Sequence, residues 1–497
     1  MKPPLSEEQI LADLKNNVVV VGREYLFVRP SFFSDDASTE WREYSFTQFR
    51  DTFSACGYSK KAANAMLSLL HMDENAMYVS HNRVFESYPL HPAGYQLIGG
   101  KPCFIRTGWN PLAPQKGSPQ PVIRQILRMF GPQADIFLGW LQGALMRQLN
   151  YRAQIAGKEL PYPPLASQTL CLCGKQGCGK TRVLLSCIIA ELLGSYTAIP
   201  ASWYNGKSKF GDWLLAASVY VADDCEPLMG YRDRVAFASR LKSLGYPERI
   251  SCECKGKASI DITFPNERIC LANLKQGAIG SLPDTSVDGD KFLALYICGP
   301  AGVNADYAGN FMLMDAALRQ AIPAFAYWLL NEYTIPTWAL GSASRRHSVM
   351  NLGENLGYVA PQIRRATAEM DQAGILIARL RRLHANPYYS KSEWYSQSQL
   401  RQALESSNGE ASMQCYSEEF TSLLNECIER WPKLIEKKRY TTGMKYRLKY
   451  SDDFDLELQN TQASDFGATY NHTLLNLVGL SQQDIEAGFT STQNQIH

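Results

Sequence analysis

Eight consecutive residues near the middle of the chain combine glycines with a lysine and a hydroxyl side chain, in the order GKQGCGKT. They are Gly174, Lys175, Gln176, Gly177, Cys178, Gly179, Lys180 and Thr181. Glycines at this spacing let backbone N–H groups surround phosphate oxygens. Lys180 would reach the β- and γ-phosphates, and the Thr181 hydroxyl would coordinate Mg²⁺. The sequence therefore predicts a site for a nucleoside triphosphate with Mg²⁺.

The flanking residues predict the setting that such a loop needs. Thr169 to Cys173 is a short apolar segment typical of a buried strand. Thr181 to Leu193 is apolar nearly all round, as a buried helix would be, and its first turn would add the positive end of a helix dipole. This strand–loop–helix order favours a true phosphate-binding loop over a chance glycine-rich turn.

A second apolar strand, Val219 to Ala222, ends in two aspartates, Asp223 and Asp224. The carboxyl ends of parallel strands meet at one edge of a sheet, so both carboxylates are expected beside the triphosphate. We assign Mg²⁺ to Thr181 and Asp223, and the orientation or deprotonation of the attacking water to the other aspartate. Glu226 is an alternative base, and the sequence does not decide between them.

A third strand, Arg268 to Ala272, ends at Asn273. An asparagine amide beside the γ-phosphate can hydrogen-bond both that phosphate and the attacking water. A polar residue that only caps a turn is the alternative. The distance in sequence from Lys180 leaves room for two intervening strands and their connections, which favours the catalytic interpretation.

Between the second and third of these segments, Ile250 to Phe264 is expected to form a hairpin with a basic tip. Its turn contains Lys255, Gly256 and Lys257. Two lysines on a tight tip suit contact with a nucleic-acid backbone, whereas solvated turn residues are the alternative.

The chain resembles superfamily 3 helicases, most closely the helicase half of phage and plasmid primase-helicases. The resemblance lies in the order and spacing of four segments: GKQGCGKT, VYVADD, the Lys-Gly-Lys hairpin and ICLAN. The upstream stretch GGKPCFIRTGWNP is similar to that family's approach to its motor, and the resemblance covers residues 95–300. It implies an AAA+-like ATPase that assembles as a ring, usually hexameric, with nucleotide at subunit interfaces and hairpins in a central channel. Asn273 would be the sensor, and Lys255 or Lys257 would grip DNA.

The chain departs from this family after the sensor strand. Members often carry an Asp-Arg-Arg-Phe-like run that supplies an arginine finger, which stabilises transition-state charge across the interface. Here the run is Asp288, Gly289, Asp290, Lys291 and Phe292. Lys291 could replace the finger, although lysine lacks the guanidinium fork, or it could be a solvated residue before a strand. The other candidates are Arg240, Arg249 and Arg345.

Near the C-terminus, two predicted helices and a hairpin resemble a winged helix. The helices are Gln397 to Glu405 and Glu418 to Trp431, and the hairpin is Tyr440 to Tyr450. The residues expected to contact DNA are basic and interleaved with tyrosines: Lys437, Lys438, Arg439, Lys445 and Arg447. The second helix is acidic, so the hairpin is the better DNA contact, with a solvated basic hairpin as the alternative.

Composition is that of an ordinary soluble protein, with 497 residues, 45% hydrophobic, and 50 Lys+Arg against 48 Asp+Glu. Thirteen scattered cysteines predict free thiols, and no stretch is apolar enough for a membrane span, so we expect an intracellular, cytoplasmic protein.

We expect an α/β P-loop NTPase core with accessory regions. The predicted regions are an α+β module (1–110), a helical collar (111–160), the ATPase motor (161–300), a helical region (301–385), the winged-helix-like domain (386–450) and a polar tail (451–497).

Together these observations favour an ATP-dependent, Mg²⁺-requiring DNA helicase or helicase loader of superfamily 3 type, acting in a bacterial host on single-stranded or forked DNA of a phage, plasmid or mobile element. The N-terminal module shows no primase or nuclease constellation, so we assign it to assembly or to recruitment of a primase or other replication partner. One alternative is a DNA-bound AAA+-type regulatory or anti-phage ATPase that switches its assembly without unwinding. Another is a nucleotide-binding scaffold without turnover.

Overall fold

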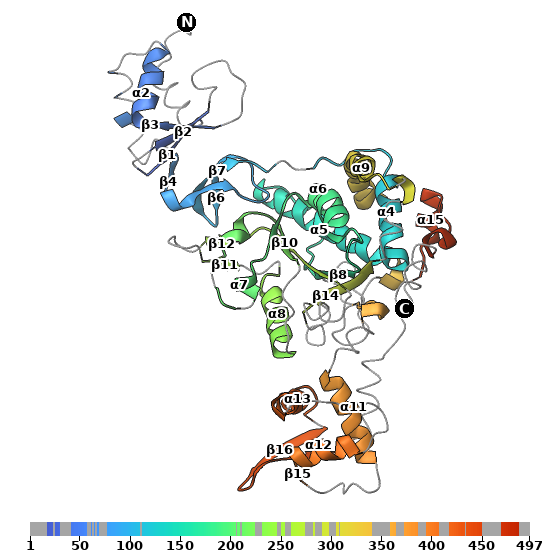
Figure 1. The fold of residues 1–497 in the computed structure, drawn as a ribbon. Helices are drawn as coiled ribbons and strands as arrows, with labels where there is room; N and C mark the ends of the chain where they lie inside the picture. The colour runs from blue at the N-terminus through green and yellow to red at the C-terminus, as the bar shows by residue number, and fades with distance from the viewer. Residues whose placement is uncertain are drawn as a thin grey trace.

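The computed structural model gathers the chain into an N-terminal, a central and a C-terminal body (Figure 1). It describes residues 17–22, 25–29, 41–56, 61, 64, 67–68, 77–109, 112–204, 206–208, 211–223, 231–245, 250–253, 260–273, 282–283, 291–297, 305–307, 309–339, 358–363, 372–385, 394–406, 417–432, 434–449 and 469–486. In this part of the chain no helix combines the length and the apolar character that a membrane crossing requires.

The N-terminal body is a four-stranded sheet with one helix. Its elements are β1 (Val18–Val21), β2 (Tyr25–Val28), β3 (Arg42–Ser45), β4 (Met77–Val79) and α2 (Phe46–Ala55), with the sheet in the order β3-β2-β1-β4. Helix α2 begins at a capping box in which the Ser45 side chain accepts from the backbone of Gln48 and the Gln48 side chain accepts from that of Ser45. Phe49 and Phe53 are buried on the inner face of this helix.

A second small sheet joins the N-terminal and central bodies. It contains β5 (Val84–Ser87), β6 (Gly94–Ile98) and β7 (Lys101–Thr107) in the order β5-β7-β6. Phe104 of β7 packs in the N-terminal core, stacked on Phe27 with ring centroids 4.0 Å apart. Its neighbours Cys103 and Ile105 point to the other face, where they join the central core. One strand therefore contributes to two cores within the region predicted as one module.

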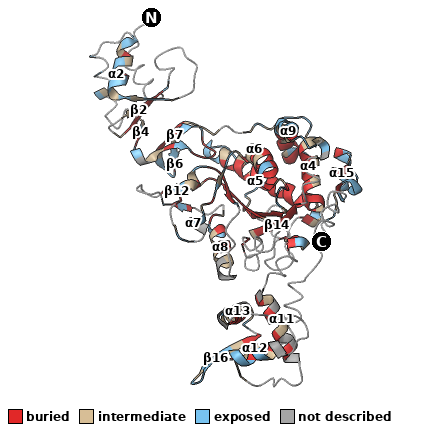
Figure 2. Cartoon of the chain, viewed as in Figure 1, coloured by how far each residue is buried: buried red, intermediate tan, exposed pale blue. Residues whose placement is uncertain are grey.

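The central body is built on a five-stranded, all-parallel sheet. Its strands are β8 (Thr169–Gly174), β9 (Tyr196–Ala198), β10 (Val219–Ala222), β13 (Glu267–Asn273) and β14 (Phe292–Ile297), in the order β14-β8-β13-β10-β9. Every residue of β8, β10 and β14 is buried (Figure 2), which explains their uninterrupted apolar sequences. The parallel sheet confirms the predicted α/β core.

Helices cover this sheet and share its core. They are α4 (Gln120–Phe130), α5 (Ala134–Ile155), the π-helical segment η4 (Lys180–Ile189) continued by α6 (Ala190–Leu193), and α9 (Phe311–Asn331), whereas α8 (Tyr231–Ser243) lies across the sheet from α5 (Figure 1). The predicted collar helix is interrupted at Gly131, whose φ is +54°, and both of its parts pack into the central core. The Gln133 side chain there pairs with the backbone of Tyr296 on the edge strand β14.

Buried polar contacts fix the start of β13 at the amino edge of the sheet. Arg147 of α5 pairs with Glu267 at 2.8 Å, and the two side chains are only 3% and 1% exposed. Arg268 donates to the Ser167 hydroxyl at 2.8 Å. A buried, charge-assisted pair of this kind sets the register of β13 against α5.

The C-terminal body has its own hydrophobic core. In chain order its elements are α11 (Gln372–Ala385), β15 (Tyr395–Ser396), α12 (Gln397–Ser406), α13 (Ser417–Arg430), β16 (Ile435–Tyr440) and β17 (Gly443–Leu448), with the sheet in the order β15-β17-β16. Helix α11 lies in the region predicted as a separate helical region (301–385), but it packs against α13 and contributes Ala373, Leu376 and Leu380 to the C-terminal core. A hairpin is present as predicted, but it spans 435–448 and turns at Thr441 and Thr442, so the predicted bounds of 440–450 were wrong.

The chain returns to the central body on both sides of the C-terminal body. Before it, Tyr358 and Ala360 hydrogen-bond Ala294 of β14 at 2.8 and 2.9 Å. After it, α15 (His472–Val478) packs on α4, where Arg124 donates to the Val478 carbonyl at 2.6 Å. The region predicted as a polar tail thus contains a helix that joins the central core through Leu474, Leu475 and Val478.

Candidate nucleotide-binding site

The glycine-rich loop connects the carboxyl end of β8 to η4, and its backbone explains the glycines. Gly177 and Gly179 have φ of +79° and +87°, a region that other residues adopt only with strain. A Cβ on Gly174 would lie 2.8 Å from Cys178 Sγ and 2.9 Å from the Ile297 carbonyl oxygen, so no side chain fits there. The loop therefore needs glycine at three positions for two different reasons.

Lys180 is 8% exposed, and its ammonium group lies among oxygen acceptors. The Nζ atom donates to the carbonyl oxygens of Gly174 and Lys175 at 3.2 and 3.1 Å, and to Asn273 Oδ1 at 2.9 Å. A buried cation needs such partners because burial without them would be costly. These contacts hold Lys180 inside the loop, where an incoming phosphate would meet it.

Asn273 reaches Lys180 because of the strand order. Strand β13 lies between β8 and β10, and Asn273 is the register partner of Gly174. On the far side of β13, the end of β10 leads directly into Asp223. The residues predicted from three separate segments therefore meet at one edge of the sheet.

Thr181 and Asp223 form the second polar pair at this edge. The Thr181 hydroxyl donates to Asp223 Oδ2 at 3.5 Å, and both residues are exposed. An accessible hydroxyl and carboxylate next to a phosphate-binding loop are oxygen ligands that Mg²⁺ accepts. No group of three or more His, Cys, Asp or Glu side chains that could hold a metal occurs in the described residues. The donor set thus fits an ion completed by phosphate oxygens and water.

Two further predicted residues, Lys291 and Arg240, lie away from this site in the described part of the chain. Lys291 immediately precedes β14, at the amino end of the parallel sheet. Six strand positions separate it from Ile297, the register partner of Gly174, which corresponds to roughly 20 Å. Arg240 lies on α8 with its guanidinium packed against Gly206. Asp224, Glu226, Arg249, Lys255, Lys257 and Arg345 lie outside the described residues.

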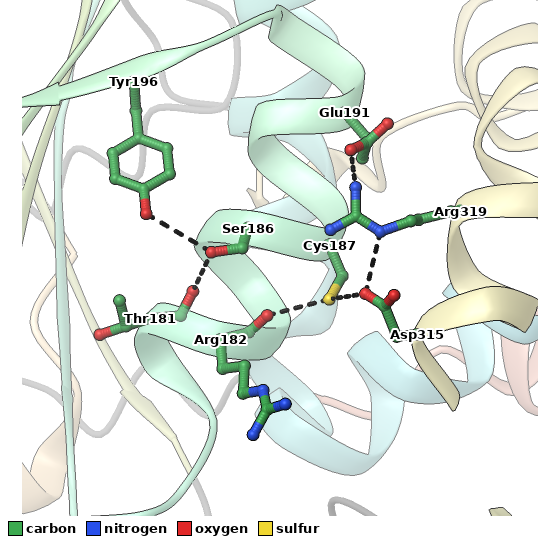
Figure 3. Close-up of polar contacts among 8 residues, drawn as sticks. All are labelled: Thr181, Arg182, Ser186, Cys187, Glu191, Tyr196, Asp315 and Arg319. Atoms are coloured by element: carbon green, nitrogen blue, oxygen red, sulfur yellow. Dashed lines mark hydrogen bonds and ion pairs between the residues drawn. The ribbon is translucent and has the colours of Figure 1, made fainter. Parts of the chain in front are cut away.

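The helix that follows the loop is tied to α9 by a polar cluster (Figure 3). Ser186 and Cys187 donate to the carbonyl oxygens five residues earlier, those of Thr181 and Arg182, at 3.1 and 2.9 Å. Cys187 Sγ also contacts Asp315 Oδ1 of α9 at 2.8 Å. Burial, reinforced by Asp315, raises the pKa of the Cys187 thiol to about 12, so the thiol remains a protonated donor.

Arg319 completes this cluster, which the sequence analysis did not foresee. It bonds Asp315 at 2.9 Å and pairs with Glu191 of α6. The i,i+4 spacing of Asp315 and Arg319 was a visible signal of a helix-surface pair, but nothing local indicated a partner in another helix. The cluster holds α9 alongside the phosphate-loop helix.

The predicted DNA-contact residues lie on the β16–β17 hairpin of the C-terminal body. Lys437, Lys438 and Arg439 are exposed on β16. The Nζ atoms of Lys438 and Lys445 lie 5.6 and 5.4 Å from the Tyr440 ring centroid. Arg447 differs, because it pairs with Glu436 at 2.8 Å and stacks over Trp394. The sequence analysis did not include Trp394, whose ring is in edge contact with Tyr440.

No known protein family matches the chain, and no curated protein does so. Among solved structures, the A form apo structure of the NrS-1 C-terminal region is similar, with a TM-score of 0.46 and 12% identity over 87% of this chain and 96% of that one. A structure of the same region, residues 305–718, has a TM-score of 0.42 with the same identity and coverage.

Proposed function

We propose that the chain is an ATP-dependent motor of superfamily 3 type that acts on DNA as an oligomeric ring, as a helicase or helicase loader. One observation carries the ATPase part of this proposal. Lys180, Asn273 and the Thr181–Asp223 pair lie together at the carboxyl edge of three adjacent parallel strands. This arrangement supplies a phosphate cradle, a cation, an amide and a carboxylate within one site.

The site residues then divide the work of phosphoryl transfer. Lys180 would exchange its carbonyl and Asn273 contacts for β- and γ-phosphate oxygens, which releases the Asn273 amide to orient the attacking water. Thr181 and Asp223 would hold Mg²⁺, which supplies neutralisation of the charge on the phosphates. We assign the water-activating base to Asp224 or Glu226.

DNA as the partner is supported by the C-terminal body. Its order of helix, strand, two helices and hairpin is that of a winged helix, and the exposed lysines of β16 form its wing. Basic side chains interleaved with aromatic rings suit backbone contact with stacking. The basic tip of the β11 (Ile250–Cys252) and β12 (Ile260–Ile262) hairpin would be a second contact, inside the ring.

The test is ATP hydrolysis and unwinding of a forked duplex by wild type, Lys180→Ala and Lys158→Ala. Lys158 is an exposed lysine after α5, so it matches the lost charge without touching the loop. We expect Lys180→Ala to abolish both activities and Lys158→Ala to retain both. Unwinding that persists in Lys180→Ala would refute the motor.

A DNA-bound switch is the second candidate, favoured by the residue type at Lys291, a lysine where superfamily 3 motors often have an arginine. A lysine in place of an arginine finger would slow hydrolysis, because it lacks the planar fork that stabilises transition-state charge. The two candidates are compared at protein concentrations at which particle images show complete rings. DNA-stimulated ATP hydrolysis without unwinding at all of these concentrations would select the switch. Unwinding under those conditions would select the helicase.

A further inference from the structure

The first turn of α9 packs on the residue that follows the phosphate loop. The Arg182 guanidinium carbon lies 3.6 Å from the centroid of the Phe311 ring. Asn310 caps α9 by accepting from the backbone of Met312 and Leu313 at 3.0 and 3.3 Å, which fixes this turn. The same turn leaves Met312 70% and Leu313 59% exposed.

The cluster in Figure 3 keeps these two elements together. Asp315 and Arg319, one and two turns after Phe311, hold α9 to Cys187 and Glu191. Arg182 contributes only its backbone carbonyl to that cluster, and its side chain points away from Cys187, Asp315 and Arg319. Within the described residues its side chain forms no hydrogen bond or ion pair, so the ring of Phe311 is its packing partner.

The loop geometry predicts what lies beside Arg182 when nucleotide is bound. Lys180 and Thr181 define the positions of the γ- and β-phosphates. The next backbone N–H, that of Arg182, belongs to the first turn of a helix, where N–H groups lack intrahelical partners and bind anions. The α-phosphate therefore comes next to Arg182, and the nucleoside extends past its side chain.

Arg182 is exposed although its guanidinium lies over the Phe311 ring, and a planar guanidinium held in this way is suited to stacking on a base. We propose that Arg182, supported by Phe311, forms the stacking platform for the base of the bound nucleotide. This inference rests on the proposed nucleotide-binding function and assigns it a base subsite at the start of α9.

The test compares binding of ATP and of inorganic tripolyphosphate, each with Mg²⁺, by titration calorimetry. Arg182→Lys keeps the charge and removes the planar group, and Phe311→Leu keeps the packing and removes the ring. We expect each variant to bind ATP about tenfold more weakly, since stacking on one base contributes on the order of 1–3 kcal/mol. Tripolyphosphate has no base, so its affinity is expected to be unchanged.

Equal losses of affinity for ATP and tripolyphosphate would overturn the stacking platform and make Arg182 a phosphate contact. No loss of affinity for either ligand would also overturn it, because the base would then bind elsewhere. Thermal unfolding of each variant shows whether the fold is retained. Lys180→Ala separates this inference from the proposed function, because it is expected to lose both ligands. If wild type binds neither ligand, the nucleotide site itself fails.

Discussion

The contact between Lys180 and Asn273 joins a cation and an amide that would both face the γ-phosphate. In the structure the two side chains satisfy each other, so each is positioned before any ligand arrives. Such preorganisation lowers the cost of aligning groups during the reaction. The pair can be perturbed from the asparagine side without removing the lysine.

We expect Asn273→Ala to lower kcat for ATP hydrolysis about 100-fold while KM changes little, because the amide acts on the transition state and Lys180 still binds phosphate. Asn273→Asp should instead weaken ATP binding, since a carboxylate at this distance would form an ion pair with Lys180 that competes with phosphate. Steady-state kinetics separates the two effects. A rise in KM alone in Asn273→Ala would contradict the assigned role.

His91 gives the fold a dependence on pH. It is 4% exposed, its Nδ1 lies 3.1 Å from the Pro89 carbonyl oxygen, and burial lowers its pKa from 6.5. The neutral form is favoured on folding, so the full contribution to stability is present above pH 6.5 and is lost as the pH falls below it. We expect the free energy of unfolding to fall less between pH 6.5 and 5 in His91→Gln than in wild type. Denaturant unfolding at a series of pH values measures this, and an equal fall in the free energy of unfolding in both proteins would contradict it.

Among the elements, β13 depends on a buried ion pair at the end opposite Asn273. Arg147→Met would leave Glu267 buried without its partner, and burial already raises the pKa of that carboxyl. We expect a loss of about 3–5 kcal/mol in the free energy of unfolding, and partial recovery when Glu267→Leu is added. Denaturant unfolding of the single and double variants measures this. A double variant less stable than the single one would show that the pair is not the unit of stability.

The sequence predicted elements better than their arrangement. Strands β8, β10 and β14 were found because fully buried parallel strands are continuous apolar runs. The polar residues after β10 and at the end of β13 marked the site. The position of β13 between β8 and β10 depends on pairing between distant segments, which no local pattern encodes. The hairpin was misplaced because Ile435–Tyr440 is largely basic and does not alternate like an ordinary strand.

Contacts between helices were the least predictable part of the site. Arg182 and Phe311 are far apart in sequence, and neither belongs to a recognisable motif. The sequence predicted a helical collar over 111–160, but a helical pattern does not show whether the helices form a separate collar or share the core of the sheet. A helix that is buried on most sides, such as α5, has the same apolar sequence pattern in a separate collar as in a core shared with the sheet.

For the whole molecule, DNA binding is expected to depend on the wing of the C-terminal body. Each lost phosphate contact should reduce the salt dependence of log K by about 1, so Lys438→Ala with Arg439→Ala should reduce it by about 2. Both side chains are exposed on β16. Glu426→Lys with Glu429→Lys on the acidic α13 is the matched control, and it should leave DNA affinity unchanged or increase it. Fluorescence anisotropy over a salt series measures these slopes. If the wing variant binds as wild type does, the DNA contact lies elsewhere.

The two returns of the chain to the central body have a mechanical consequence. The C-terminal body is connected on one side to residues that pair with β14 and on the other to α15, which packs on α4. Helix α4 itself contacts β14, and β14 is paired along its length with β8, the strand that leads into Gly174. If DNA binds to this hairpin as we propose, tension on the DNA would reach the same edge of the sheet through both connections, one strand away from the glycine-rich loop.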